Sequence, residues 1–203
     1  MFFIDDIEIS KKVKPFLLAE VACSHDGSIT RVRQMVNAVA DAGMDGIQFQ
    51  LFSTGLLLAP YHPFYKKVKQ LEIPLKDWPA LIELAHERKL KVFANVLETS
   101  GIDVALSSKV DVLKIHSSDL SNPKMLEGVT RSGLPIVLST GGSTVEEIRA
   151  AINELKLVGE VENLLLMHGY QAFPTNIKES HFLMNINVIL DWWKNNIIYK
   201  KNG

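Results

Sequence analysis

The stretch DVLKIHSSDLSNPKMLEGVTRSGLPIVLSTGG, residues 111–142, decides the fold class. It opens with the apolar run Asp111–Ile115, continues with a helical pattern over Pro123–Ser132, and closes with a second apolar run, Pro135–Leu138. Pro suits the first turn of a helix, where no backbone N–H is needed, and Gly133 is placed to end that helix. Apolar runs without polar alternation are typical of parallel strands that are covered on both faces. The stretch therefore predicts one strand–helix–strand unit.

The same alternation extends in both directions along the chain. Helix signals accompany it, because Ser28 or Thr30 can cap a helix that Gly43 ends, and residues 143–146 resemble a capping box. The segment Phe52–Ile73 is predicted as an unusually long loop. The further strands are expected at Phe16–Val21, Gly46–Leu51, Leu90–Val96 and Asn163–Met167, and the further helices at Ser28–Ala42, Pro74–Lys89, Ser100–Ser107 and Ser143–Leu157.

Six strand–helix units predict a parallel α/β protein, either a doubly wound open sheet or a (β/α) barrel. Each predicted strand carries a polar residue at or just after its carboxyl end. A barrel gathers such residues around one pocket, whereas an open sheet concentrates them at one switch point, so we favour the barrel. The polar residues in question are Glu20, Gln48, Gln50, Asn95, Lys114, Ser117, Ser139 and His168.

Composition narrows the class of function. The 203 residues include 22 Lys plus Arg and 23 Asp plus Glu, and this balance gives no electrostatic reason to expect nucleic acid or a membrane as partner. One cysteine, Cys23, forms no internal disulfide, which suits a reducing compartment. The first ten residues lack the basic start and apolar core of a signal peptide. We expect a cytoplasmic protein with a small ligand.

Lys114 is the strongest candidate for chemistry. A lysine inside an apolar strand is costly unless it meets an anion. It either forms a structural ion pair, for instance with Asp119, or binds a phosphate or carboxylate, or acts as an amine nucleophile. The turn Ser139–Ser143 is either an ordinary connection or an anion site made of small residues before a helix N-terminus. Lys114 on the preceding strand favours the anion site.

Other candidates keep two interpretations each. His168 is either a core histidine or a functional one, as a metal ligand or a proton carrier. His25 either binds ligand or shapes the first strand–helix turn. A carboxylate at the end of a buried strand, as at Glu20, requires a partner. Cys23 is more typical of a small packed residue than of a nucleophile. We expect His62, His86 and the lysines of residues 66–69 to be solvated.

Five blocks of sequence, in the correct order over residues 16–190, resemble the N-acetylneuraminate (sialic acid) synthase family. These blocks are LLAEVACSHDG at 17–27, AGMDGIQFQ at 42–50, VLKIHSSD at 112–119, PIVLSTG at 135–141 and HGYQAFPT at 168–175. The resemblance implies a TIM-type (β/α) barrel that condenses phosphoenolpyruvate with an N-acetylated aminosugar to give a nonulosonic acid and phosphate. It also implies a divalent metal, Mn²⁺ or Mg²⁺.

The resemblance also assigns roles. Lys114, Ser117 and Ser139 would hold phosphoenolpyruvate, Glu20 and Gln50 would contact substrate, and Asp119 would replace a family glutamate in catalysis. Further substrate-binding positions are Gln48, Asn95, Gln171 and Phe173, and His168 is the first metal ligand. Gln48 stands where the family has lysine, Asn95 lies in a different third-strand end, and Phe173 lacks the hydroxyl of the usual tyrosine.

The C-terminal part departs further from the family. The loop with its second metal histidine, strands seven and eight and the usual antifreeze-like domain do not appear in the sequence, so about six of eight strands are expected. We expect a partial barrel domain at residues 1–190, an atypical tail at 191–203, and a weakened metal site. Open strand edges favour a homo-oligomer or a C-terminal partner. The alternatives are a silent phosphoenolpyruvate- or sugar-binding module, a fragment of a longer synthase, or another phosphoenolpyruvate-using synthase.

Overall fold

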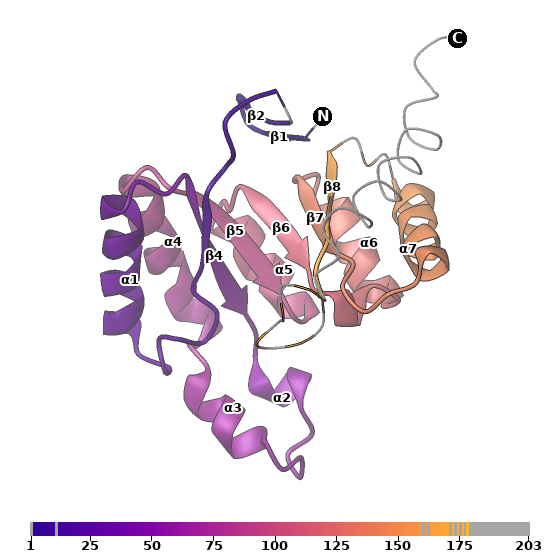
Figure 1. Ribbon diagram of the computed structural model, residues 1–203. Helices are drawn as coiled ribbons and strands as arrows, with labels where there is room; N and C mark the ends of the chain where they lie inside the picture. Colours follow the sequence, from indigo (N-terminus) through magenta and orange to yellow (C-terminus); the bar gives the residue numbers. More distant parts are fainter. Residues whose placement is uncertain are drawn as a thin grey trace.

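Strand order follows chain order in the central sheet (Figure 1). In the part of the chain that the computed structural model describes, residues 2–10, 12–159, 161, 163–170, 172, 174, 176 and 178, six parallel strands form this sheet. Each strand pairs with the next one along the chain, which confirms the predicted α/β barrel class with six of eight strands. The strands are β3 (Leu18–Glu20), β4 (Gly46–Leu51), β5 (Lys91–Val96), β6 (Val112–Ile115), β7 (Ile136–Ser139) and β8 (Leu164–Met167).

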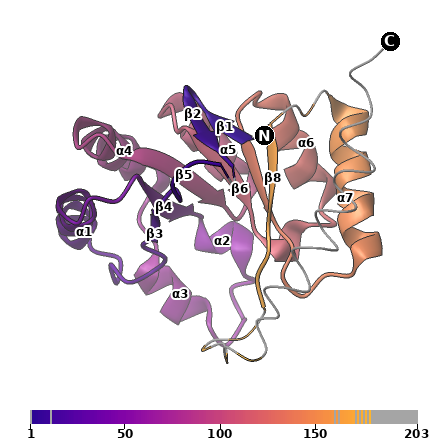
Figure 2. The ribbon, with the colours of Figure 1, turned by 45° about the horizontal axis from the view of Figure 1, so that its top comes forward.

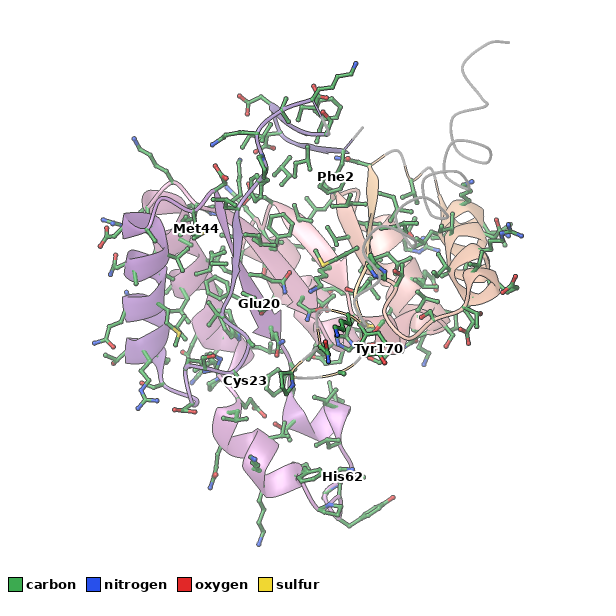
Figure 3. The ribbon with its side chains drawn as sticks, viewed as in Figure 1. Phe2, Glu20, Cys23, Met44, His62 and Tyr170 are labelled. Carbon is green, nitrogen blue, oxygen red and sulfur yellow. The ribbon has the colours of Figure 1, made fainter. Side chains whose placement is uncertain are left out.

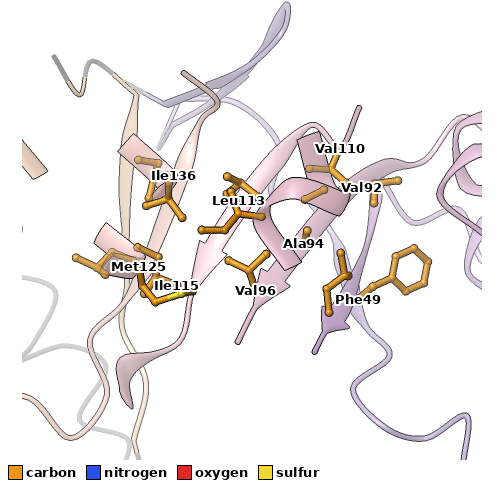
Figure 4. Packing of buried hydrophobic residues seen from close by; sticks show 14 of the residues in the cluster. Phe49, Val92, Ala94, Val96, Val110, Leu113, Ile115, Met125 and Ile136 are labelled. Atoms are coloured by element: carbon orange, nitrogen blue, oxygen red, sulfur yellow. The ribbon is translucent and has the colours of Figure 1, made fainter. Parts of the chain in front are cut away.

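Helices cover the outer, convex face of the sheet. Alternate strand residues, such as Phe49, Val96 and Leu113, point outward and pack against the helices in one large apolar cluster (Figure 4). Because these residues are fully buried, they supply most of the hydrophobic stabilisation of the fold. The helices are α1 (Ile29–Asp41), α4 (Trp78–Glu87), α5 (Thr99–Ser107), α6 (Pro123–Arg131) and α7 (Val145–Val158).

A β-hairpin that the sequence did not predict closes the amino-terminal end of the barrel. Its strands are β1 (Phe2–Ile4) and β2 (Ile7–Ile9), and Figures 1 and 2 place it at the end of the sheet away from α3 (Tyr65–Leu71). Phe2 and Ile4 pack against the inward-facing strand residues Phe93, Val112 and Val137. This second apolar cluster is the floor of the barrel.

Polar contacts fix the hairpin to the sheet. The side chain of Asn163 accepts a hydrogen bond from the N–H of Phe3 at 2.9 Å and donates one to its carbonyl oxygen. Lys91 bridges Asp5 in the hairpin turn and Asp111, whose carboxylate also accepts hydrogen bonds from the N–H of Val92 and from His86. His86 therefore has a specific partner, and the expectation that it is simply solvated was wrong.

Three local expectations differ from the structure. The segment predicted as a long loop holds two short helices, α2 (Thr54–Leu57) and α3, followed by the 3₁₀ turn η1 (Leu75–Asp77). The capping box of α7 is formed by Thr144 and Glu147, one residue later than predicted. The first strand is shorter than residues 16–21, because Phe16 turns onto the floor cluster. The lysines of α3 are exposed, as expected.

No helix in the described part is both long and apolar enough to cross a lipid bilayer. The expected boundary at residue 190 and the tail at 191–203 lie outside the described residues, so the division into domains stays a prediction.

Candidate active site

Alternation along the strands places the candidate residues on the concave face of the sheet. On β5, for example, Val92, Ala94 and Val96 pack against the helices, and Phe93 faces the floor. Asn95 shares the face of Phe93, because side chains two residues apart point the same way. The same argument, applied to each strand in turn, places on this face Glu20 of β3, Gln48 and Gln50 of β4, Lys114 of β6 and Ser139 of β7.

The register brings these residues close together. Glu20 is opposite Gln48, Gln50 is opposite Asn95, and Asn95 is opposite Lys114. Side chains directly opposite each other on neighbouring strands are close enough to interact. The result is a polar layer toward the carboxyl ends of the strands, above the apolar floor.

Lys114 faces Glu20 across this layer. Its ammonium lies 3.9 Å from Glu20 Oε2, and its side chain is only 12% exposed. Burial lowers the pKa of Lys114, and the neighbouring Glu20 carboxylate partly offsets this effect. The carboxylate that Lys114 meets is therefore on β3, and not on Asp119 as the ion-pair interpretation suggested. Its separation from Glu20 leaves the ammonium able to contact a further anion.

Glu20 is less enclosed than the sequence indicated. Its side chain is 41% exposed, and its carboxylate accepts a hydrogen bond of 2.8 Å from the N–H of Ala22. Desolvation raises the pKa of Glu20, while this hydrogen bond and Lys114 act in the opposite direction. In Figure 3, Glu20 lies between Phe2 at the hairpin end and Cys23 toward α2. The carboxylate is therefore positioned at the mouth of the polar layer.

The amide side chains of the polar layer differ in their hydrogen-bond partners. Gln50 Oε1 accepts a contact of 3.7 Å from the thiol of Cys23. Gln48 and Asn95 are almost completely buried, and the oxygens Gln48 Oε1 and Asn95 Oδ1 have no hydrogen-bond partner. Buried polar atoms without partners are rare in proteins and mark positions that a ligand or water can complete.

The loops after β6 and β7 line a cavity of about 500 Å³. Ser117, in the 3₁₀ turn η2 (Ser117–Asp119), lies in its wall together with Gly141, Gly142 and Ser143, which precede α7. Asp119, in the same turn, accepts a hydrogen bond of 2.9 Å from the side chain of Asn122, the N-cap of α6. The cavity thus joins Ser117 to the Gly141–Ser143 part of the turn, and neither Lys114 nor Ser139 lines it.

His168 follows β8 and is half-buried. Among the described residues, no group of three or more His, Cys, Asp or Glu side chains is arranged to hold a metal ion. The divalent metal stays a prediction. Gln171 and Phe173 lie outside the described residues.

Two further side chains belong to the surroundings of the site. Glu98, which the sequence analysis missed, is buried two residues beyond β5, and its carboxylate caps α5 through the N–H of Ser100 at 2.7 Å. Its place after a strand end is the signal that would have found it. His25 accepts a hydrogen bond from the N–H of Gly27 and packs edge-on against Trp78, which favours the turn-shaping interpretation.

Comparison with known proteins decides the family. The NeuB family model matches residues 35–194 of the 203. The chain belongs to the NeuB family. It is 28% identical over 186 residues to an uncharacterised protein of Methanocaldococcus jannaschii, covering 92% of this chain and 54% of the other. It is 27% identical over 181 residues to the N,N'-diacetyllegionaminic acid synthase of Legionella pneumophila, covering 81% and 51%.

A solved NeuB-type structure has the same fold. The sialic acid synthetase of Leptospira borgpetersenii superposes with a TM-score of 0.87 at 25% identity, covering 94% of this chain and 66% of that one. The chain spans about half the length of the curated relatives it matches. Membership in the NeuB family and the similarity to sugar-acid synthases agree with the resemblance found in the sequence blocks.

Proposed function

We propose that this chain catalyses the condensation of phosphoenolpyruvate with an N-acetylated aminosugar to give a nonulosonic acid. The observation that carries the proposal is the ammonium of Lys114, enclosed on the concave face of a NeuB-family barrel and opposite Asn95 in register. An ammonium that is largely enclosed and lies 3.9 Å from the Glu20 carboxylate is suited to bind a second anion. Phosphoenolpyruvate, with its phosphate and carboxylate, supplies such anions.

The reaction joins the methylene carbon of phosphoenolpyruvate to the aldehyde carbon of the sugar. Water adds to the carbon that carries the phosphate, and phosphate leaves, so that the two substrates and one water give one sugar acid and one phosphate. Negative charge develops on the former aldehyde oxygen as the new bond forms. Prearranged donors at that position stabilise the transition state more than the ground state.

The residues of the polar layer divide these tasks. In the proposal, Lys114, Ser117 and Ser139 hold the anionic groups of phosphoenolpyruvate, and Gln50 contacts the sugar. Glu20, whose pKa is raised by desolvation, is placed to exchange a proton at the mouth of the layer. Asp119 supports the loop that carries Ser117, because its carboxylate anchors the N-cap of α6.

The proposal also includes a divalent metal ion, a cellular location and a partner chain. A divalent ion would supply a Lewis acid for the aldehyde oxygen, with His168 as one ligand. The described residues do not complete such a site. We also propose a cytoplasmic location, in keeping with the single cysteine, and association with a second copy or a C-terminal partner.

Phosphate release tests the proposal. Purified protein is incubated with phosphoenolpyruvate and N-acetylmannosamine, with Mn²⁺ or with a chelator, and phosphate is measured. We expect sugar-dependent release that Lys114→Met abolishes and that the exposed-lysine control Lys67→Met leaves unchanged. Absence of release across a set of N-acetylated aminosugars, with Mn²⁺ present, would refute the proposed reaction.

A second candidate is a binding module that does not turn over. The observation that favours it is the largely enclosed ammonium of Lys114, which suits anion binding with or without turnover. It predicts that calorimetry detects phosphoenolpyruvate binding that Lys114→Ala removes, although no phosphate is released. Binding together with release decides for the enzyme.

A further inference from the structure

The turn that follows β6 begins with a histidine whose side chain caps it. His116 Nδ1 accepts a hydrogen bond of 3.2 Å from the N–H of Ser118, and it lies 2.9 Å from the hydroxyl oxygen of the same serine. Asn and Asp make such a contact with the N–H two residues ahead through Oδ1, which occupies the same place in the side chain as Nδ1 of histidine. His116 therefore replaces the usual Asn or Asp of this kind of turn. Of the three residue types, only histidine has an ordinary pKa near neutral pH.

The capped turn carries two residues of the candidate site. It is the 3₁₀ turn η2, in which the N–H of Asp119 donates to the carbonyl oxygen of His116 at 3.0 Å. The hydroxyl of Ser118 donates to Asp119 at 3.4 Å, and Asp119 accepts a further hydrogen bond from Asn122, the N-cap of α6. Ser117 lies between the cap and these contacts, in the wall of the cavity that His116 also lines. The cap therefore helps to fix the backbone that presents Ser117.

The contact with Ser118 requires a neutral imidazole. Because a backbone N–H only donates, His116 Nδ1 carries no proton while it caps the turn. A protonated Nδ1 donates instead to the hydroxyl oxygen of Ser118, which leaves the N–H without this acceptor. Among the described residues, the charged groups that act on His116 are Lys114 of β6 and Asp119 of η2, and Glu147 of α7 lines the same cavity. Burial lowers the pKa of His116 and Lys114 lowers it further, whereas Asp119 acts in the opposite direction. The neutral, capping form therefore prevails at neutral pH.

We propose that His116 is a positioning residue, which holds Ser117 in place for the anionic substrate while its imidazole is neutral and releases the turn when it is protonated. This inference rests on the proposed function, in which Ser117 binds phosphoenolpyruvate. It predicts that acid weakens phosphoenolpyruvate binding through this side chain. It also predicts that asparagine, which keeps the acceptor and stays neutral, preserves binding and removes this part of the pH dependence.

The test compares His116→Asn and His116→Leu with the wild type in the full chain. His62 supplies a matched control, because its Nδ1 accepts a hydrogen bond of the same 3.2 Å length from the N–H of Phe64, in the exposed segment between α2 and α3 (Figure 3). Calorimetry measures phosphoenolpyruvate binding without sugar between about pH 5 and pH 8, the range in which histidine changes charge. Thermal unfolding is measured at each pH without ligand.

The two His116 variants should behave differently. We expect His116→Leu to bind phosphoenolpyruvate about 5- to 30-fold more weakly than the wild type at pH 8 and to unfold about 2–4 °C lower, because the cap is lost. His116→Asn should match the wild type within about twofold at pH 8 and bind about 2- to 10-fold more tightly than the wild type near pH 5. Protonation of the ligand and of Glu20 affects both proteins alike and cancels in this ratio. His62→Leu and His62→Asn should leave the affinity unchanged.

Several results would overturn the inference. Equal binding by His116→Leu and the wild type shows that Ser117 does not depend on the cap. Weaker binding by His116→Asn at pH 8 indicates that the imidazole itself contacts the ligand. Wild-type binding that does not weaken in acid relative to His116→Asn excludes release of the turn by protonation, and binding that strengthens indicates a cationic contact. Failure of the wild type to bind phosphoenolpyruvate at any pH refutes both the inference and the proposed reaction. Binding that follows the cap, without any phosphate release when sugar is added, sustains the inference and refutes the proposed reaction.

Discussion

Lys114 shows how far a single residue can be interpreted from sequence. Its position in an apolar strand predicted a buried cation in need of an anion, and the structure encloses it as expected. The identity of its neighbour could not be predicted, because Glu20 is nearly a hundred residues away and only the strand register brings the two together. Nearness in sequence favoured Asp119, which instead holds Asn122.

The lowered pKa of Lys114 predicts the pH dependence of phosphoenolpyruvate binding. The anion binds the protonated amine, so affinity is full below the pKa of Lys114 and falls as pH rises through it. Because burial lowers that pKa from 10.5, the fall begins below pH 10.5 and approaches about tenfold per pH unit. Calorimetry between neutral and alkaline pH measures it. Lys114→Arg should bind without this fall, since arginine stays charged; an identical fall in the variant assigns the titration to another group.

Gly27 allows a sharp test of backbone geometry. Its φ is +71°, and a Cβ there would lie 2.1 Å from the carbonyl oxygen of Gln70 in α3. Gly43 has a similar φ of +73° but no atom within 4 Å of its Cβ position. We expect Gly27→Ala to destabilise by about 2–4 kcal/mol and Gly43→Ala by about 1 kcal/mol in urea unfolding. Equal losses would mean that the contact with Gln70 yields without cost.

Among the secondary-structure elements, those with strong local signals were predicted best. Ser28 caps α1, and Pro123 begins α6 after Asn122, as the sequence indicated. Elements that depend on distant contacts were missed. The strands of the hairpin are three residues each, and they are held by Asn163 and by the floor cluster, neither of which is visible in the local sequence.

The amino-terminal hairpin gives a prediction about stability. Ile4 is 1% exposed and packs on the floor, whereas Phe3 on the same strand is 40% exposed. Ile4→Ala should lower the free energy of unfolding by about 2–4 kcal/mol, since it leaves a cavity in the floor. Phe3→Ala should cost less than about 1 kcal/mol, because its contacts with Asn163 are made by the backbone. Chemical denaturation measures both, and similar losses would show that the hairpin is not held through its inward face.

For the whole molecule, the prediction of a parallel α/β barrel was confirmed. It could be made because every strand showed the same pattern in the sequence, an apolar run with a polar residue at or just after its carboxyl end. The alternation of β4, with Ile47, Phe49 and Leu51 outward and Gln48 and Gln50 inward, determines the concave face. The sequence could not fix which inward amides lack partners, because hydrogen bonding depends on side chains from neighbouring strands. Gln171 and Phe173 stay predictions.

The open sheet gives a prediction about association. Within the described chain, β3 and β8 each pair with one strand only, so each has an edge whose backbone groups lack a strand partner. Such edges promote pairing between chains. Sedimentation velocity over a wide range of concentrations should show dimers or larger species that dissociate on dilution. A monomer at every concentration would contradict this expectation.

The division of the sheet into an outer apolar face and an inner polar face affects how the protein can evolve. Residues that hold the helices in place, such as Val96 and Leu113, are not the residues that border the polar layer. Substitutions at inward positions such as Gln48 or Asn95 therefore do not remove a side chain from the outer apolar cluster that holds the helices. Selection can therefore change a few inward positions of such a barrel while the outward-facing residues keep the helices in place.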